Sequence, residues 1–126
     1  LLAPSILVNM HLKTPVAAAT GAGDRTAGVA LATVYARLLD GKSSLEDAVR
    51  SPRYAPGLSA GQILLEKGAP QALREALASR GATIREVPAI GLVNIMYCPA
   101  TMRERPDQCT VLTDPRGYGH AINAEF

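Results

Sequence analysis

A glycine-rich stretch, Thr20-Gly21-Ala22-Gly23-Asp24-Arg25-Thr26, has the residue types and spacing to bind an anion. It follows an apolar, strand-like run over residues 15–19 and precedes a helix-like run from Ala27 to Leu39. Such a turn directs several backbone N–H groups at one point, and the helix dipole adds positive potential there. The anion is either a bound phosphate or carboxylate, or the oxyanion that forms during acyl transfer. We expect the oxyanion- or substrate-binding N–H groups to come from Gly21, Ala22, Gly23 and Asp24.

Two other interpretations of this turn follow from the residues alone. One is a tight strand-to-helix connection that holds no ligand, since glycines are common in turns. The other is a dinucleotide-binding fingerprint. The fingerprint is disfavoured because Thr26 stands where its third glycine belongs, and no second parallel strand is expected between the helix and Pro52.

The remaining candidate groups lack the partners that catalysis or metal binding needs. Ser5 and Thr20 carry hydroxyls, but neither lies in a Gly-x-Ser-x-Gly elbow or has a histidine close in sequence. His11 and His120 are far apart, with no cysteine or carboxylate near them at ligand spacing. We therefore expect neither a metal site nor a cofactor, and we expect His11 to lie in a turn.

Composition limits the class of protein. A chain of 126 residues, 48% hydrophobic and 19% charged, predicts one globular domain over residues 1–126 with a modest core. The net charge of +2, without a basic cluster, argues against nucleic-acid binding. The apolar runs are far shorter than the ~20 residues of a membrane span. Because the chain begins at Leu1 without an initiator Met or a signal-peptide pattern, we expect it to start inside a longer gene product.

The elements that position the glycine turn are well marked. Residues 5–9 and 14–20 form two strand-like runs joined by the polar turn at 11–13, which predicts a hairpin. The helix after the turn is expected to be capped by Asp24 or Thr26, whose side chains can accept free N–H groups. The turn is thus expected between a hairpin strand and a helix.

The second half of the sequence alternates helices and strands. The spacing of Ser43 and Glu46 predicts a capping box for a short helix that Pro52 ends. Pro70 and Gly81 bound a predicted amphipathic helix. Strands are expected at residues 63–67, 83–87, 91–98 and 109–113, with the last three ending the chain as a small antiparallel sheet. The fold class is therefore α+β.

The order of these motifs resembles the C-terminal part of the small subunit of γ-glutamyltransferases (γ-glutamyltranspeptidases). The resemblance runs over nearly the whole chain, and the order and spacing of individually short motifs carry it. The matching segments are Pro4-Ser5-Ile6-Leu7-Val8, Thr20-Gly21, Glu46-Asp47-Ala48-Val49-Arg50-Ser51-Pro52-Arg53-Tyr54, Leu65-Glu66-Lys67-Gly68, Arg80-Gly81 and Thr113-Asp114-Pro115-Arg116-Gly117.

The resemblance implies an N-terminal-nucleophile hydrolase with an αββα sandwich, mainly antiparallel, with two to three helices in this part. In that family a proenzyme cleaves itself and a threonine begins the small subunit, where it is the nucleophile and its α-amine the base. Leu1 cannot play that part, so the nucleophile is expected upstream of Leu1. The fragment alone is then expected to be inactive.

Two departures from the family pattern bear on the substrate. The family has Gly-Ser-Pro-Gly-Gly-Ser at the turn, where this chain has residues 21–26; backbone N–H groups can line an oxyanion hole whatever side chain they carry, except in proline. Family members also carry Ser-Ser-Met-Ser-Pro, whose paired serines hold the substrate's α-carboxylate. Here Leu1 and Leu2 lead into Ala3-Pro4, and leucine offers no hydrogen bond. We therefore expect a divergent member that acts on γ-glutamyl or related amide groups.

The resemblance also implies partners and a compartment. The expected partners are a small-molecule amide substrate, the rest of the small subunit and a large subunit, in a homo- or hetero-oligomer. The family is commonly periplasmic or secreted, which favours a disulfide between Cys98 and Cys109 across the loop that separates two expected strands; two unpaired thiols are the alternative. Arg53 and Arg116 are expected mainly to hold structure, with Asp114 fixing a turn. A non-catalytic anion-binding or assembly domain of the same fold is the competing functional class.

Overall fold

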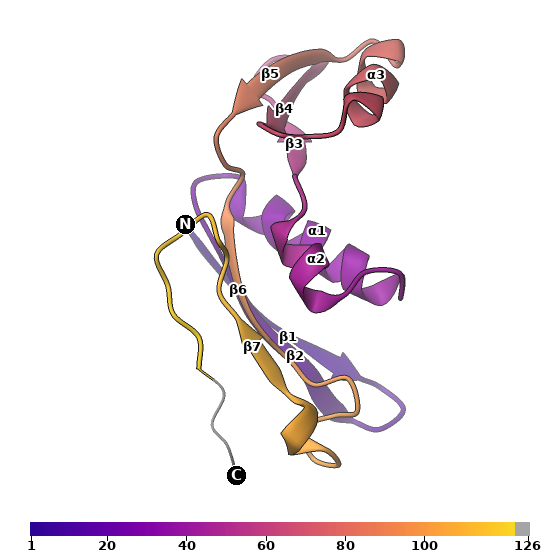
Figure 1. Cartoon of the computed structure of the whole chain (residues 1–126), viewed down its shortest axis with the longest axis vertical. Coiled ribbons are helices and arrows are strands. Elements are labelled where there is room, and N and C mark those ends of the chain that lie inside the picture. The colour runs from indigo at the N-terminus through magenta and orange to yellow at the C-terminus, as the bar shows by residue number, and fades with distance from the viewer. Residues whose placement is uncertain (123–126) are drawn as a thin grey trace.

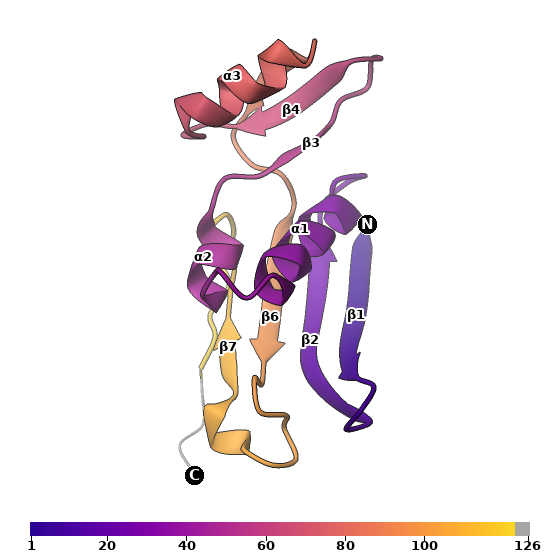
Figure 2. The same cartoon turned by 90° about the vertical axis from the view of Figure 1, so that its right-hand side faces the viewer.

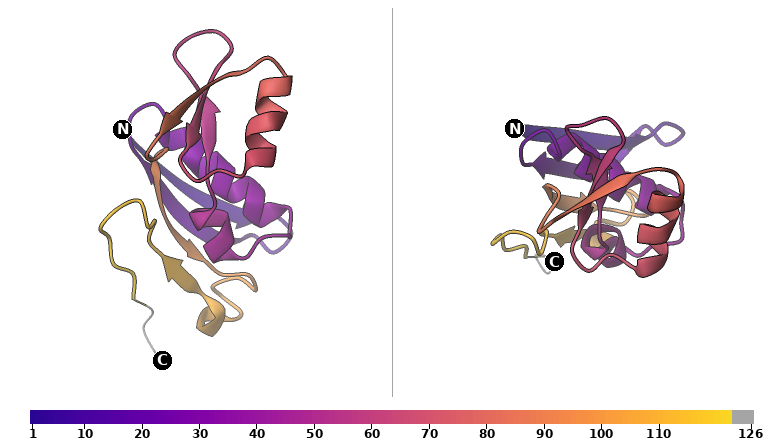
Figure 3. Two further views of the ribbon diagram at one scale, coloured as in Figure 1. Left: turned by 45° about the horizontal axis from the view of Figure 1, so that its top comes forward. Right: turned by 90° about the horizontal axis from the view of Figure 1, so that it is seen from above.

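The structure is a computed structural model, and it describes residues 1–122. A four-stranded antiparallel sheet in the order β1-β2-β6-β7 carries α1 and α2 on one face (Figures 1 and 2). A three-stranded sheet in the order β3-β4-β5, flanked by α3, extends from one end of the first sheet (Figure 3). Among residues 1–122, no helix combines the length and apolar character needed to cross a membrane.

The predicted N-terminal hairpin is confirmed. Strand β1 (Leu2–Asn9) pairs with β2 (Thr14–Ala22), and side chains alternate between the helix-covered face and the opposite face. The connecting turn forms because the Asn9 side-chain oxygen accepts the backbone N–H groups of His11 and Leu12, at 3.0 and 3.1 Å. His11 is therefore a turn residue, as its position in the sequence predicts.

Helices α1 (Ala27–Leu39) and α2 (Leu45–Arg50) bury the core against the first sheet. Small residues on β2, Ala17 and Ala19, let α1 approach the sheet closely, and Val34 of α1 is fully buried in the same core cluster. The predicted capping box of α2 is one residue off. Ser44, in an extended conformation, is the N-cap and accepts the Asp47 N–H, so Ser43 and Glu46 do not form the box.

The second sheet corrects the prediction that all three last strands form one antiparallel sheet. Strand β5 (Thr83–Val87) pairs in parallel with β4 (Gln62–Glu66), because α3 (Gln71–Ser79) forms the crossover between them. A short strand missing from the prediction, β3 (Tyr54–Pro56), pairs with the other edge of β4.

The last two strands extend the N-terminal hairpin instead. Strand β6 (Leu92–Tyr97) pairs with β2, and β7 (Thr110–Leu112) follows a 3₁₀ turn, Pro106–Gln108, and pairs with β6. The face of this sheet away from the helices stays open apart from the C-terminal segment, which runs along it to residue 122 (Figure 1). Apolar side chains on that face are exposed, including Leu2 at 73% and Ile6 at 68%.

The chain passes between the two sheets twice, and its return from β5 to β6 runs through one crowded glycine. Gly91, just before β6, has a φ of +60°, and a Cβ atom there would lie 2.7 Å from the Cβ of Ala30 on α1. A side chain at position 91 therefore meets both a disfavoured backbone conformation and a filled core.

We expect Gly91→Ala to lower the free energy of unfolding by roughly 2–4 kcal/mol, the sum of the conformational and overpacking costs. Gly41→Ala is the matched control, because Gly41 has a φ of +72° but no atom within 4 Å of a built Cβ. In the control, the free energy of unfolding should fall only by the conformational cost, without the overpacking cost. Urea unfolding followed by circular dichroism measures both; equal losses would show that packing at Gly91 is not limiting.

Candidate functional site

The glycine turn lies between the last residue of β2 and the first turn of α1. Gly21 and Ala22 are paired with both β1 and β6, so their backbone groups belong to the sheet. The N–H of Gly23 donates to the carbonyl of Leu1 at 3.2 Å. Of the four residues that the sequence singles out, only Asp24 has a backbone N–H that lies outside the sheet and donates to no other residue within 1–122.

Asp24 and Arg25 form the exposed tip of the turn. The Asp24 carboxylate accepts the N–H of Thr26 at 3.0 Å, and its carbonyl accepts the N–H of Ala27. Thr26 is the N-cap residue of α1, but its side chain makes no capping hydrogen bond; the Asp24 carboxylate instead accepts the N–H of this N-cap residue. The hydrogen bond from the Thr26 backbone holds the pKa of the Asp24 carboxyl below its usual value. Within residues 1–122, the N–H groups of Asp24 and Arg25 have no other residue as acceptor.

A cavity of about 450 Å³ separates the turn from the second sheet. Residues 22–26 form one wall, and side chains of β4 and β5, including Leu64 and Arg85, form the other. Gly91 and Leu92, at the start of β6, close one side. Exposed turn amides therefore border a cavity large enough for a small molecule.

A buried arginine fixes the wall at Gly91. The Arg53 side chain is fully buried, and its guanidinium donates to Asp114 at 2.7 Å and to the carbonyls of Ile90 and Gly91, at 3.1 and 3.3 Å. A Cβ built on Gly23 would lie 3.4 Å from the Cα of Gly91. Arg53 thus holds the backbone at Ile90 and Gly91, and Gly91 lies against Gly23 of the glycine turn.

A second arginine completes this ion cluster. Arg116 pairs with Glu66 at 2.6 Å and with Asp114 at 3.0 Å, and it also donates to carbonyls of α2 and its C-terminal end. Glu66 in turn accepts the backbone N–H groups of Arg53 and Ile90. We call Arg53, Glu66, Asp114 and Arg116 the ion cluster. It joins the end of β7 in the first sheet to β4 in the second.

Hydrogen bonding determines which groups in the ion cluster are charged. Burial raises the pKa of the Asp114 carboxyl, but the N–H of Arg116 and the Arg53 guanidinium outweigh it and hold the pKa below its usual range. Burial also opposes the charge on Glu66, and hydrogen bonds from Arg116 again lower the pKa. Both carboxylates are therefore ionised near neutral pH.

The sequence predicts a structural role for both arginines and a turn at Asp114, and the contacts agree with that. The Asp114 side chain accepts the Arg116 N–H and its carbonyl accepts the Gly117 N–H, which is the predicted turn. Glu66 is the member that the prediction lacks. Its position at the end of the apolar run Ile63-Leu64-Leu65 was a usable signal, because a buried carboxylate requires a cation.

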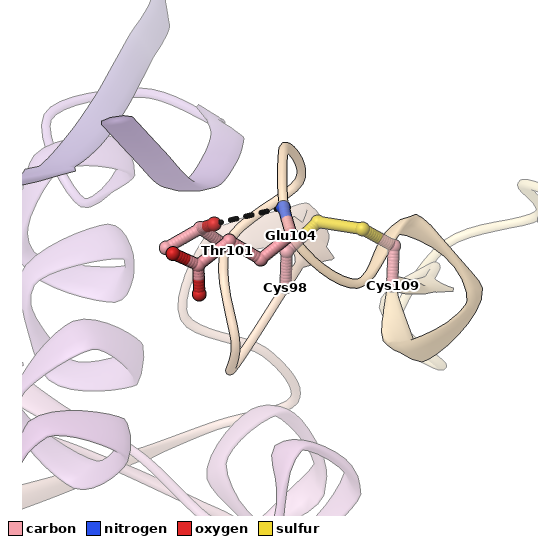
Figure 4. The surroundings of a disulfide bond; sticks show 4 residues. All are labelled: Cys98, Thr101, Glu104 and Cys109. Carbon is pink, nitrogen blue, oxygen red and sulfur yellow. Dashed lines mark hydrogen bonds between the residues drawn. A yellow bond between two sulfur atoms is a disulfide. The ribbon is translucent and has the colours of Figure 1, made fainter. Parts of the chain in front are cut away.

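The other predicted groups lie away from the turn. Cys98 and Cys109 form a disulfide with an S–S distance of 2.11 Å at the far end of β6, beside a bend where the Thr101 hydroxyl accepts the Glu104 N–H (Figure 4). The Ser5 hydroxyl donates to the carbonyl of Ala19 and is hydrogen-bonded with the Tyr35 hydroxyl.

Thr20 and His120 both line a cavity of about 980 Å³ on the open face of the first sheet. Among residues 1–122, neither the Ser5 nor the Thr20 hydroxyl is hydrogen-bonded to a histidine. No group of three or more metal-binding side chains occurs in that part of the chain either.

Comparison with known proteins identifies the family. The profile of the gamma-glutamyltranspeptidase family matches residues 1–124. The chain belongs to this family. A search of curated protein sequences finds no match.

Solved structures of family members share the fold. Gamma-glutamyltranspeptidase from Pseudomonas nitroreducens superposes with a TM-score of 0.81 at 19% identity, over 98% of this chain and 62% of that chain. The Helicobacter pylori gamma-glutamyltranspeptidase T380A mutant gives 0.74 at 22% identity, over 92% and 61%. The transpeptidase CapD of Bacillus anthracis gives 0.74 at 16% identity, over 98% and 70%. This is the α+β fold of N-terminal-nucleophile hydrolases, and the chain spans about three fifths of the first two relatives.

We expect Asp114→Asn to lower the free energy of unfolding by about 3–5 kcal/mol, because it leaves the buried Arg53 without a countercharge. Asp107→Asn is the matched control, since Asp107 pairs with Arg105 on the surface. The control should change stability little. Urea unfolding at neutral pH measures both, and a loss as small as that of the control would contradict this account of the ion cluster.

Acid supplies a second readout for the same variant. The folded-state pKa values of Asp114 and Glu66 are lowered, so their stabilising effect is complete above the unfolded-state values of about 4 and is lost as the pH falls through the folded-state values. The wild-type stability should therefore drop below about pH 4. The stability of Asp114→Asn should drop less steeply, because Glu66 is then the one carboxylate of the ion cluster left to be protonated.

Proposed function

We propose that residues 1–126 form a single domain, the C-terminal portion of the small subunit of an enzyme that cleaves or transfers γ-glutamyl or related amide groups. The observation that carries this proposal is the glycine turn, which presents the amides of Asp24 and Arg25 beside a cavity. The family match and the shared fold support it. The whole protein then hydrolyses the amide or passes its acyl group to an acceptor amine.

The nucleophile in this proposal comes from outside the chain. Ser5 is occupied by Ala19 and Tyr35, and Thr20 has no base bonded to it within residues 1–122. The carbonyl of Leu1 accepts the N–H of Gly23, so the N-terminal end of β1 lies beside the turn (Figure 1). A nucleophile that reaches this end of the sheet is close to the amides that stabilise its oxyanion.

The proposed reaction assigns these amides one task. The nucleophile adds to the amide carbonyl, whose oxygen becomes an oxyanion and accepts hydrogen bonds from the N–H groups of Asp24 and Arg25. The tetrahedral intermediate collapses with cleavage of its C–N bond, and the amine leaves with the proton that the nucleophile gave up, so that an acyl-enzyme remains. Water or an acceptor amine then attacks the acyl-enzyme and frees the nucleophile.

The open face of the first sheet supplies the place for the remaining part of the protein. Exposed Leu2 and Ile6 lie on that face, and a cavity of about 980 Å³ extends over it. Such apolar area is normally covered by protein. We propose that the rest of the small subunit covers it and that a large subunit completes the enzyme.

The full-length protein should split into two subunits, visible by gel and mass analysis, and should release the chromophore from a γ-glutamyl anilide. Residues 1–126 alone should give no turnover above a no-protein control. Turnover by residues 1–126 alone would contradict the proposal that the nucleophile lies outside these residues. An unsplit full-length protein without turnover would favour the non-catalytic anion-binding or assembly domain.

We expect Gly23→Val to lower kcat of the full-length enzyme by roughly 10²-fold, the scale of losing one oxyanion donor. Gly23 has a φ of +137°, and a branched side chain there is strained and displaces the neighbouring amides from the cavity. Gly28→Val, on the exposed side of α1 with nothing within 4 Å, is the control and should retain kcat. An unchanged rate in folded Gly23→Val protein means that the turn is only a connection.

A further inference from the structure

The cavity beside the glycine turn has two kinds of wall. Leu58, Leu64 and Leu92 give it apolar sides, while the turn and β5 contribute polar and charged groups. Its volume of about 450 Å³ suits a small organic molecule.

Two arginines on different elements line this cavity. Arg25 comes from the turn and Arg85 from β5, and within residues 1–122 neither has a carboxylate at ion-pair distance. The half-buried Arg74 pairs with Glu86, which follows Arg85 in the sequence, and the exposed Arg105 pairs with Asp107. Exposed Arg80 and Arg103 have no ion pair within residues 1–122 either, but they do not line the cavity.

Among residues 1–122, the only carboxylate that lines the cavity is that of Asp24, which accepts the Thr26 amide at the start of α1. One acid therefore faces two arginines. Two cations across one cavity repel each other unless an anion lies between them.

A guanidinium presents its N–H groups in a planar fork that matches a carboxylate, and the apolar sides match a short methylene chain. We propose that this cavity is an anion subsite that takes a carboxylate at the end of a short methylene chain, held by Arg25 and Arg85. That this carboxylate belongs to the substrate or the acceptor rests on the proposed function. The binding of a carboxylate by the two arginines does not depend on it. The subsite makes acidic amides the favoured substrates.

Glutarate, a dicarboxylate with a short methylene chain, is the probe, and glutaramide is its uncharged counterpart. Isothermal titration of the full-length protein should show glutarate binding that weakens with added salt. Arg25→Gln and Arg85→Gln should each weaken it roughly tenfold, the scale of one charge-assisted hydrogen bond. Arg80→Gln, an exposed arginine outside the cavity, should leave it unchanged.

Three results overturn the proposal: no glutarate binding, equal binding by all three arginine variants, or equal binding of glutaramide. The titration involves no turnover, so its outcome is separate from that of the proposed function. If the protein binds glutarate but releases no chromophore from the anilide, the proposed subsite stands and the proposed enzymatic function fails. If the protein does not bind glutarate, and Arg25→Gln and Arg85→Gln leave chromophore release unchanged, the proposed subsite fails and the proposed enzymatic function stands.

Discussion

The ion cluster is the interaction on which the arrangement of the two sheets depends. Arg53 and Glu66 belong to the start and the end of the second sheet's first hairpin, and Asp114 and Arg116 follow the last strand of the first sheet. Charges removed from water stabilise a fold only when their hydrogen bonds are almost complete. Here backbone N–H and C=O groups from several segments supply most of these hydrogen bonds. The ion cluster therefore forms fully in only one arrangement of those segments.

That arrangement determines the shape of the candidate site. The guanidinium of Arg53 contacts the carbonyl of Gly91, Gly91 packs against Gly23 and α1, and the cavity lies between this contact and β5. No single element forms the cavity. Its width follows from how the second sheet is placed, which the ion cluster sets from a position outside the cavity lining.

Local patterns predicted what local forces determine. The Asn9 turn, the strand before Gly21 and the α3 helix begin and end close to where residue types place them, because caps and turns act within a few positions. The parallel pairing of β4 with β5 and the role of Glu66 escaped prediction, since both join positions far apart in the sequence. The sequence predicts that four amides of the glycine turn bind an anion, but two of these residues are paired within the sheet and the N–H of a third donates to the Leu1 carbonyl.

The two ends of β6 are held by chemically different means. At Tyr97 the strand runs into the covalent bridge between Cys98 and Cys109, while at Leu92 it enters the region of buried charges. A reducing agent thus acts on the end remote from the glycine turn, and protonation of Asp114 and Glu66 acts on the near end. One end of the strand is therefore held by a bond that depends on redox conditions, and the other by charges that depend on pH.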